Sequence, residues 1–199
     1  MTLALIDCGA GNLHSVANAL AAAGGAATVT ADAAVVMRAE RIVLPGVGAF
    51  GGCIAALRAM PGMIAALERR VLHDGVPFLG ICVGMQLLAE TGEEFGEHAG
   101  LGWFAGRVGR LAPAGGERVP HMGWNAVAPV AGHPLIRPGE AYFLHSFAYR
   151  GEGVVATTDH GGPVAAAIGR DNILGVQFHH EKSQRYGIAL LERFLRWRP

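Results

Sequence analysis

The first half of the chain alternates short apolar runs with segments in which apolar residues recur at helical spacing. This pattern predicts strands over residues 3–6, 27–30, 42–44 and 76–81, and helices over residues 12–23, 33–37, 53–59, 63–73 and 84–90. Asn12 is a favoured helix cap, and Gly24-Gly25 marks the end of the first helix. Strands and helices that alternate in this way predict parallel strands with helices on both faces of an open sheet.

The second half of the chain has a different pattern, in which shorter apolar segments are separated by Gly and Pro turns. Strands are predicted over residues 108–111, 123–127, 141–144, 154–157, 164–168 and 173–178. These are expected to add antiparallel strands to the mostly parallel sheet. A last helix over residues 184–197 has a wide apolar face. We find no repeat or linker, so residues 1–199 are expected to form a single α/β domain.

Composition limits the class of protein. The chain is 51% hydrophobic and 16% charged, which is typical of a well-packed globule. The formal net charge is zero and no basic stripe is present, so neither nucleic acid nor an anionic membrane is an expected partner. Three cysteines without a close-spaced pair favour a reduced, cytoplasmic setting. No signal peptide is recognised, and no apolar run reaches the ~18 residues of a membrane span.

The stretch FLGICVGMQLL, residues 78–88, places Cys82 between Gly80 and Gly84 at the end of an apolar strand. A cysteine among apolar residues is usually a small buried hydrophobe. Gly-x-Cys-x-Gly at a strand-to-helix turn is, however, the cysteine counterpart of the serine nucleophile elbow. A helix N-terminus also favours the thiolate form. Cys82 is therefore a candidate nucleophile that needs a base.

The best candidate base lies in GVQFHHEKS, residues 175–183. Side chains alternate between faces in extended chain, so His179 and Glu181 are expected to point one way and His180 the other. His179 is then predicted to act as the base and Glu181 to orient its ring, as in a catalytic triad. Two surface histidines at a strand end remain the plainer interpretation when this segment is taken alone.

Acyl transfer also needs N–H donors for an oxyanion. The N–H of Val83, directly after Cys82, is one expected donor. The glycine-rich turn PGVG, residues 45–48, is expected to supply another through Val47 or Gly48. This turn lacks the Lys-Ser/Thr of a phosphate-binding P-loop.

These stretches, in this order, resemble the class I, triad-type glutamine amidotransferases. The resemblance is carried by IDCGAGNL (6–13), PGVGAF (45–50), GICVGMQLL (80–88), HMGWN (121–125), HSF (145–147) and residues 175–183. Within the class, PGVG together with MGWN is most similar to the glutaminase subunits that serve a cyclase of histidine biosynthesis.

The resemblance implies a flavodoxin-like sheet and hydrolysis of glutamine to glutamate and ammonia through a thioester on Cys82. It implies glutamine contacts at Gly48, Gln86, His145, Ser146 and Phe147. The implied partner is a (β/α)8-barrel cyclase, bound as a heterodimer, which uses the ammonia to make imidazole glycerol phosphate and aminoimidazole carboxamide ribotide. The implied partner-interface residues are Met122, Trp124, Asn125 and Lys182. No metal or organic cofactor is expected.

The chain departs from the class at three positions. His180 stands where proline is usual, which removes a backbone restriction from His179 and adds a second imidazole. We predict that His179→Ala abolishes glutamine hydrolysis, whereas His180→Ala leaves most of it. Cys8 and Phe147 replace the usual tyrosines; Cys8 is interpreted as structural.

Alternatives remain open at this point. A zinc site at residues 82 and 179–181 lacks a second cysteine or a spaced His pair. Gly9-Ala10-Gly11 hints at a dinucleotide loop but lacks the third glycine. The glutamates of residues 90–97 are predicted to lie in a solvated loop. Five scattered histidines are predicted to lie at the surface or at caps: His14, His73, His98, His133 and His160. A non-catalytic relative, or a glutaminase serving another synthase, are the competing functions.

Overall fold

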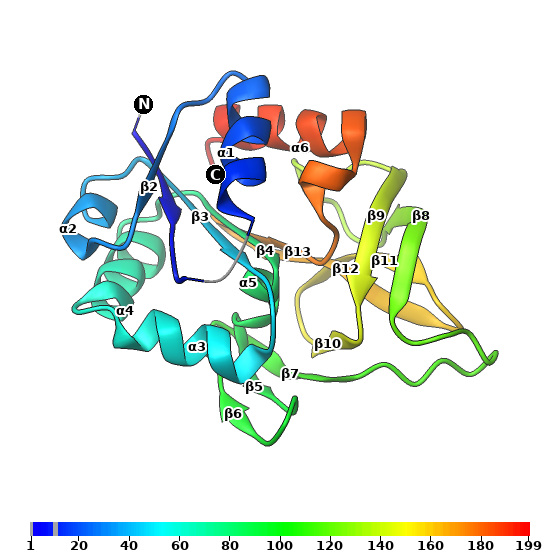
Figure 1. Ribbon diagram of the computed structural model, residues 1–199. Coiled ribbons are helices and arrows are strands. Elements are labelled where there is room, and N and C mark those ends of the chain that lie inside the picture. The colour runs from blue at the N-terminus through cyan, green and yellow to red at the C-terminus, as the bar shows by residue number, and fades with distance from the viewer. Residues whose placement is uncertain (1, 10–11) are drawn as a thin grey trace.

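A nine-stranded sheet forms the centre of the computed structural model, which describes residues 2–9 and 12–199 (Figure 1). The strand order is β2-β1-β3-β4-β13-β12-β11-β8-β9. The parallel half contains β2 (Ala27–Thr30), β1 (Leu3–Ile6), β3 (Arg41–Gly46), β4 (Phe78–Cys82) and β13 (Ile173–Val176). The antiparallel half contains β12 (Pro163–Arg170), β11 (Val154–Asp159), β8 (His121–Pro129) and β9 (Gly139–His145).

A second, four-stranded sheet lies against the first. Its order is β10-β7-β5-β6, from β10 (Phe147–Gly151), β7 (Phe104–Arg110), β5 (Ala89–Gly92) and β6 (His98–Ala99). The chain passes from β9 of the large sheet to β10 of the small sheet through a bend at Ser146. Residues 145–147 therefore join the two sheets.

Helices cover both faces of the parallel strands. Figure 1 shows α1 (Leu13–Ala22) and α6 (Gln184–Arg196) on one side, with α3 (Phe50–Ala59) and α4 (Met63–Leu67) on the other. The shorter elements are α2 (Ala33–Val36), α5 (Val83–Gln86), a π-helix η1 (Glu68–His73) that continues α4, and a 3-10 helix η2 (His180–Lys182). The Asn12 side chain caps α1 by accepting from the Ser15 N–H at 3.3 Å, as expected.

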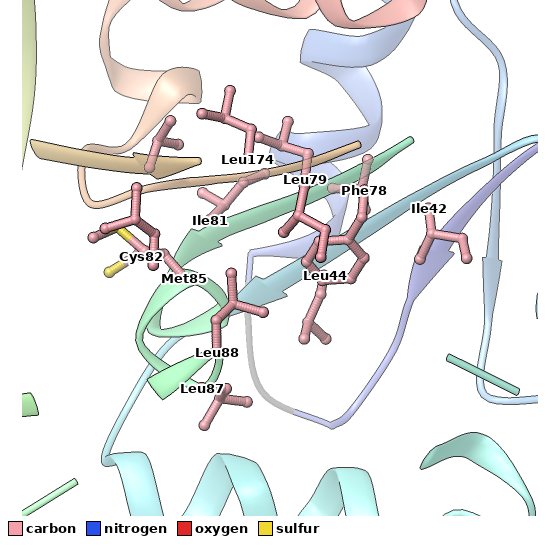
Figure 2. Close-up of a cluster of buried hydrophobic side chains, with 14 of the residues drawn as sticks. Ile42, Leu44, Phe78, Leu79, Ile81, Cys82, Met85, Leu87, Leu88 and Leu174 are labelled. Atoms are coloured by element: carbon pink, nitrogen blue, oxygen red, sulfur yellow. The ribbon is translucent and has the colours of Figure 1, made fainter. Parts of the chain in front are cut away.

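The middle strands are buried along their whole length because helices cover both of their faces. Every residue of β3 and β4 is buried. Figure 2 shows Ile42, Leu44, Phe78, Leu79, Ile81 and Leu174 packed together, with Cys82 at the end of this cluster. A close-packed core thus fixes the strand end that carries the candidate nucleophile.

The expected fold class is confirmed: parallel core strands come first and antiparallel strands follow. The helix predicted over residues 84–90 is wrong beyond Gln86, because the chain turns into β5 and pairs with β7. The predicted glutamate loop is accordingly strand β5 followed by a turn into β6. The strand predicted to residue 178 ends at Val176. Strand β10 was not predicted, and Ala10 and Gly11 of the glycine turn lie outside the described residues.

Within the described residues, no single helix has the length and apolar character needed to cross a membrane. Phe50–Ala59 and Met63–His73 meet those criteria only as a pair, with a 92° bend between them.

Candidate active site

The turn at Cys82 has the geometry of a nucleophile elbow. Cys82 ends β4 with φ 55° and ψ −113°, a strained conformation for a residue with a side chain. A Cβ on Gly80 would lie 2.6 Å from the Gly84 carbonyl oxygen, and one on Gly84 would overlap the Leu44 carbonyl oxygen. The two glycines are therefore required by the close approach of β4, α5 and β3. Helix α5 has four residues, so its dipole is short.

His179 and Glu181 are paired as predicted, although by a different route. His179 Nδ1 lies 3.0 Å from Glu181 Oε1. Strict strand alternation does not produce this pair, because β13 ends at Val176 and η2 begins at His180. The tight 3-10 turn brings the carboxylate back onto the ring. His180 is also not a surface residue, since it is 1% exposed.

The electrostatics favour a charged His179. Burial by itself lowers the pKa of His179, but hydrogen bonds to Cys82 and Glu181 and the charges of both partners outweigh burial and raise that pKa to about 9. Burial likewise tends to raise the pKa of Glu181, yet its hydrogen bond with His179 and the neighbouring imidazoles lower it below its ordinary value. Nδ1 of His179 is occupied by Glu181, so Nε2 is the ring nitrogen left for Cys82.

Two buried glutamine side chains connect Cys82 to the β9–β10 junction. The Gln177 Nε2 group donates to Cys82 Sγ at 3.7 Å, and Gln177 Oε1 accepts from Gln86 Nε2 at 3.0 Å. The Gln86 Nε2 group also donates to the Phe147 carbonyl at 3.1 Å. Gln177 was not singled out from the sequence. The available signal was a polar residue, here fully buried, between Val176 and Phe178 in an apolar strand end.

A cavity of about 730 Å³ opens over the triad residues. Of the residues predicted for catalysis, oxyanion binding or glutamine contact, it is lined by Val47, Gly48, Cys82, Val83, Gln86, His145, Ser146, Phe147, His179 and Glu181. Lys182, predicted at the interface, also lines it. The sequence did not predict Asn12, Glu94, Pro120 or Leu144 as lining residues.

Glu94 binds the N-terminus of α3, a contact between residues that are distant in the sequence. It was expected in a solvated loop, but its Oε2 accepts from the Phe50 N–H at 2.9 Å, at the first turn of α3. A carboxylate at a helix N-terminus is favourable, because the unpaired N–H groups and the dipole attract negative charge. No local signal near residue 94 could reveal a partner 44 positions away.

The glycine-rich turn at residues 45–48 has a defined peptide orientation. The Val47 carbonyl accepts from the Cys53 thiol at 3.4 Å, and Gly48 has φ +104°. In a trans peptide the carbonyl oxygen and the following N–H point in opposite directions. The N–H of Gly48 therefore points away from Cys53. The N–H of Val83 is the first of α5 and has no partner within that helix.

A chain of histidines supports the far wall of the cavity. His145 Nδ1 lies 2.9 Å from the Phe147 carbonyl, and His145 Nε2 lies 3.2 Å from His121 Nδ1. Asn125 Nδ2 approaches His121 Nε2 at 3.1 Å. Burial lowers the pKa of both His121 and His145 to about 4, so both rings are neutral near pH 7. Only one tautomer of each ring satisfies all three contacts, with the proton on Nδ1.

His160 was expected at the surface or at a cap, and it is instead half-buried on this chain of histidines. Its ring stacks on His121 with centroids 4.2 Å apart. His160 Nε2 lies 2.9 Å from the Arg118 carbonyl.

The predicted interface residues divide between two faces of β8. Met122 and Trp124 are 65% and 48% exposed, and the Trp124 ring meets the Tyr142 ring edge to face at 6.2 Å. Lys182 Nζ lies 5.7 Å from the centre of the same Tyr142 ring. Asn125 lies on the opposite face, where its Nδ2 also donates to the Asp159 carbonyl. Met122, Trp124 and Lys182 are thus the exposed members of the predicted set.

In the part of the chain that the structure describes, no group of three His, Cys, Asp or Glu side chains is arranged to hold a metal ion. The zinc alternative therefore gains no support from the arrangement of these residues.

The fold and the site together define a glutamine amidotransferase of class I. The family model described as "Glutamine amidotransferase class-I" matches residues 4–197. A crystal structure of a glutamine amidotransferase has a TM-score of 0.76 with this chain, at 19% identity and 98% coverage of both chains. The glutaminase domain of Trypanosoma brucei CTPS has a TM-score of 0.64 at 14% identity, covering 100% of this chain and 95% of that one. At these sequence identities, the structural similarity establishes the fold alone.

Sequence relatives narrow the class. The imidazole glycerol phosphate synthase subunit HisH of Zymomonas mobilis is 60% identical over 206 residues, covering 100% of this chain and 97% of that protein. The HisH subunit of Rhodospirillum rubrum is 49% identical over 214 residues, covering 100% of both. The chain belongs to the HisH family of imidazole glycerol phosphate synthase subunits.

Proposed function

We propose that this chain hydrolyses glutamine to glutamate and ammonia for histidine biosynthesis, with Cys82 as nucleophile, His179 as base and Glu181 as the group that orients His179. The observation that carries this proposal is the His179 Nδ1–Glu181 Oε1 contact of 3.0 Å at the wall of the cavity that Cys82 lines. The raised pKa of His179 supports a protonated imidazole beside Cys82 in the resting site.

In the proposed reaction, the Cys82 thiolate attacks the side-chain amide carbon of glutamine and forms a tetrahedral oxyanion. The N–H groups of Val83 and of the turn at Val47 and Gly48 stabilise that oxyanion. The His179 imidazolium gives its proton to the amide nitrogen, so the C–N bond breaks and ammonia leaves a glutamyl thioester. His179 then takes a proton from water, the hydroxide displaces the sulfur, and glutamate is released. No metal or organic cofactor takes part.

The cavity offers contacts for the rest of the substrate. Gly48, Ser146 and Phe147 contact glutamine directly in this proposal, and His145 acts through Phe147, because both of its ring nitrogens already have partners. Gln86 acts through Phe147, because both of its amide hydrogens are already donated. Of the described lining residues, Glu94 and Glu181 are acidic. Oε1 of Glu181 is bound to His179, and the oxygen that it leaves free is buried. Glu94 is therefore the group we assign to the glutamine ammonium.

The proposed partner is a (β/α)8-barrel cyclase, bound as a heterodimer, that uses the ammonia to make imidazole glycerol phosphate and aminoimidazole carboxamide ribotide. The names of the HisH relatives imply a partner subunit. Exposed Met122, Trp124 and Lys182 support docking of the partner along β8 and η2. Asn125 contributes indirectly, because its bonds to His121 and the Asp159 carbonyl hold β8 in position. In this proposal residues 1–199 act as one domain, since the buried core extends from Leu3 to Trp197. The proposed setting is the cytoplasm, because the three cysteines without a close-spaced pair favour a reducing compartment.

The test is glutamate release from glutamine, measured for the chain alone and then with the cyclase and its ribonucleotide substrate. Strong release in the mixture that is lost in Cys82→Ala supports the proposal. Glutamate release at the same rate with and without the cyclase supports the glutaminase chemistry but assigns the chain to another pathway. No release under either condition favours a non-catalytic binding relative.

A further inference from the structure

His180 is a buried imidazole that the proposed mechanism does not use. It is 1% exposed, and within the described residues neither of its ring nitrogens has a hydrogen-bond partner. Oε2 of Glu181 is likewise buried without a hydrogen bond. These unsatisfied groups face each other, with His180 Nδ1 and Glu181 Oε2 3.5 Å apart.

A buried carboxylate oxygen that lacks a donor is costly, because it has lost its water without a replacement. The separation of 3.5 Å is slightly longer than a hydrogen bond, which spans ~2.7–3.2 Å, so a small shift of the ring closes the gap. The backbone of His180 lacks room to move, since a Cβ on Gly187 of α6 would overlap the His180 carbonyl. The backbone from which the His180 side chain extends is therefore packed closely against α6.

The charge state of His180 suits a donor. Burial lowers the pKa of His180 to about 4, against the opposing charge of Glu181, so the ring is neutral near pH 7. Glu181 and His179 are the titratable groups that act on it among the described residues. A neutral ring carries one proton, and Nδ1 is the ring nitrogen that lies 3.5 Å from Glu181 Oε2. Proline, usual here in the class, has no such donor.

We propose that His180 is a positioning residue of the triad: its Nδ1–H binds Glu181 Oε2 and thereby holds Glu181 Oε1 on His179 Nδ1. This inference rests on the proposed function. It revises the expectation that loss of His180 leaves most of the activity, because the carboxylate that orients His179 is then held at one oxygen.

The test compares His180→Leu with His180→Asn in the complex with the cyclase. Asn places an N–H donor where His carries Nδ1, whereas Leu has nearly the same shape and no donor. We expect His180→Leu to lower kcat about three- to tenfold with an unchanged KM for glutamine. The acid limb of the kcat/KM profile moves to higher pH, since Glu181 loses a group that stabilises its charge. His180→Asn restores kcat to within about twofold and returns the acid limb.

Thermal unfolding and cyclase binding of each variant serve as folding controls. His180→Leu with the wild-type kcat and pH profile overturns the proposal, as does a folded His180→Asn that is as slow as His180→Leu. An independent readout is the ring tautomer of His180, measured by NMR on the histidine-¹⁵N-labelled chain. A proton on Nδ1 supports the proposal, and one on Nε2 overturns it. This readout tests the role of His180 even when a variant fails to fold. It also remains valid when the wild type releases no glutamate, a result that would contradict the proposed function.

Discussion

His121 and His145 are direct register partners across β8 and β9, and their rings meet with 3.2 Å between Nδ1 and Nε2. His145 in turn holds the carbonyl of Phe147, which lines the cavity. The position of the cavity wall therefore depends on a residue of β8 that does not itself line the cavity.

Substitution of His121 tests that dependence. His121→Phe keeps a ring to stack on Phe143 and His160 but removes both hydrogen bonds. We expect KM for glutamine to rise about three- to tenfold with little change in kcat. The reason is that Ser146 and Phe147, which are proposed to bind glutamine, lose a support, whereas the triad stays in place. Steady-state kinetics of the complex measure both constants. His73→Phe, at an exposed position on η1, is the control, and a fall in kcat at constant KM contradicts the assignment.

The pH dependence of stability follows from His179. Its pKa is raised from 6.5 to about 9, so its contribution to the free energy of unfolding is complete below pH 6.5 and is lost as pH rises through 9. Cys82→Ala removes the interactions with Cys82 that raise this pKa. We expect NMR titration of His179 to give a lower midpoint in Cys82→Ala, and denaturant unfolding of that variant to vary less with pH between these limits. An unchanged midpoint would show that Cys82 does not interact with His179.

Partner binding is expected to depend on Trp124. Exposed aromatic side chains often dominate interface energetics, so Trp124→Ala should weaken cyclase binding by about 30-fold or more. Leu72→Ala is the matched control, because Leu72 is 45% exposed and precedes β4, at the end of the sheet opposite Cys82. Isothermal titration with the cyclase measures both variants. Equal affinities for the two would remove Trp124 from the interface.

The elbow predicts a difference between two glycines. Gly84→Ala should lower the free energy of unfolding by about 2–4 kcal/mol, because the new Cβ overlaps the Leu44 carbonyl oxygen. Gly52→Ala, in α3 with open space around its Cα, should change stability by less than about 1 kcal/mol, in the stabilising direction. Urea denaturation measures both. A stable Gly84→Ala would mean that α5 can move away from β3.

Residues with a local signature were predictable from the sequence. Alternating strands and helices gave the parallel core, and Gly-x-Cys-x-Gly located the elbow at Cys82. Helix 84–90 was wrong because an apolar run of that length fits a helix or a buried strand equally well, and pairing with β7 decides for β5. The pairing of His179 with Glu181 was predicted from an alternation that the 3-10 turn replaces.

Residues whose roles depend on distant partners could not be predicted. Gln177 meets Cys82 across 95 positions, and Glu94 meets Phe50 across 44. His160 reaches His121 through the turn between β11 and β12, which no periodicity of either strand encodes. His180 differs from an ordinary surface histidine because it is buried. That burial depends on α6, whose Gly187 packs against the His180 backbone, and the local sequence does not reveal this contact.

Tyr142 belongs to two environments at once. Its ring contacts the exposed side chains of Trp124 and Lys182, while its carbonyl accepts the backbone N–H of His179 at 2.9 Å. Its own N–H donates to the hydroxyl of Ser183, which in turn donates to the His179 carbonyl at 2.6 Å. The peptide groups on both sides of the base are thus anchored to one residue of β9. A molecule that binds to the outer face of the β8–β9 hairpin therefore contacts the residue that anchors the backbone of the proposed base.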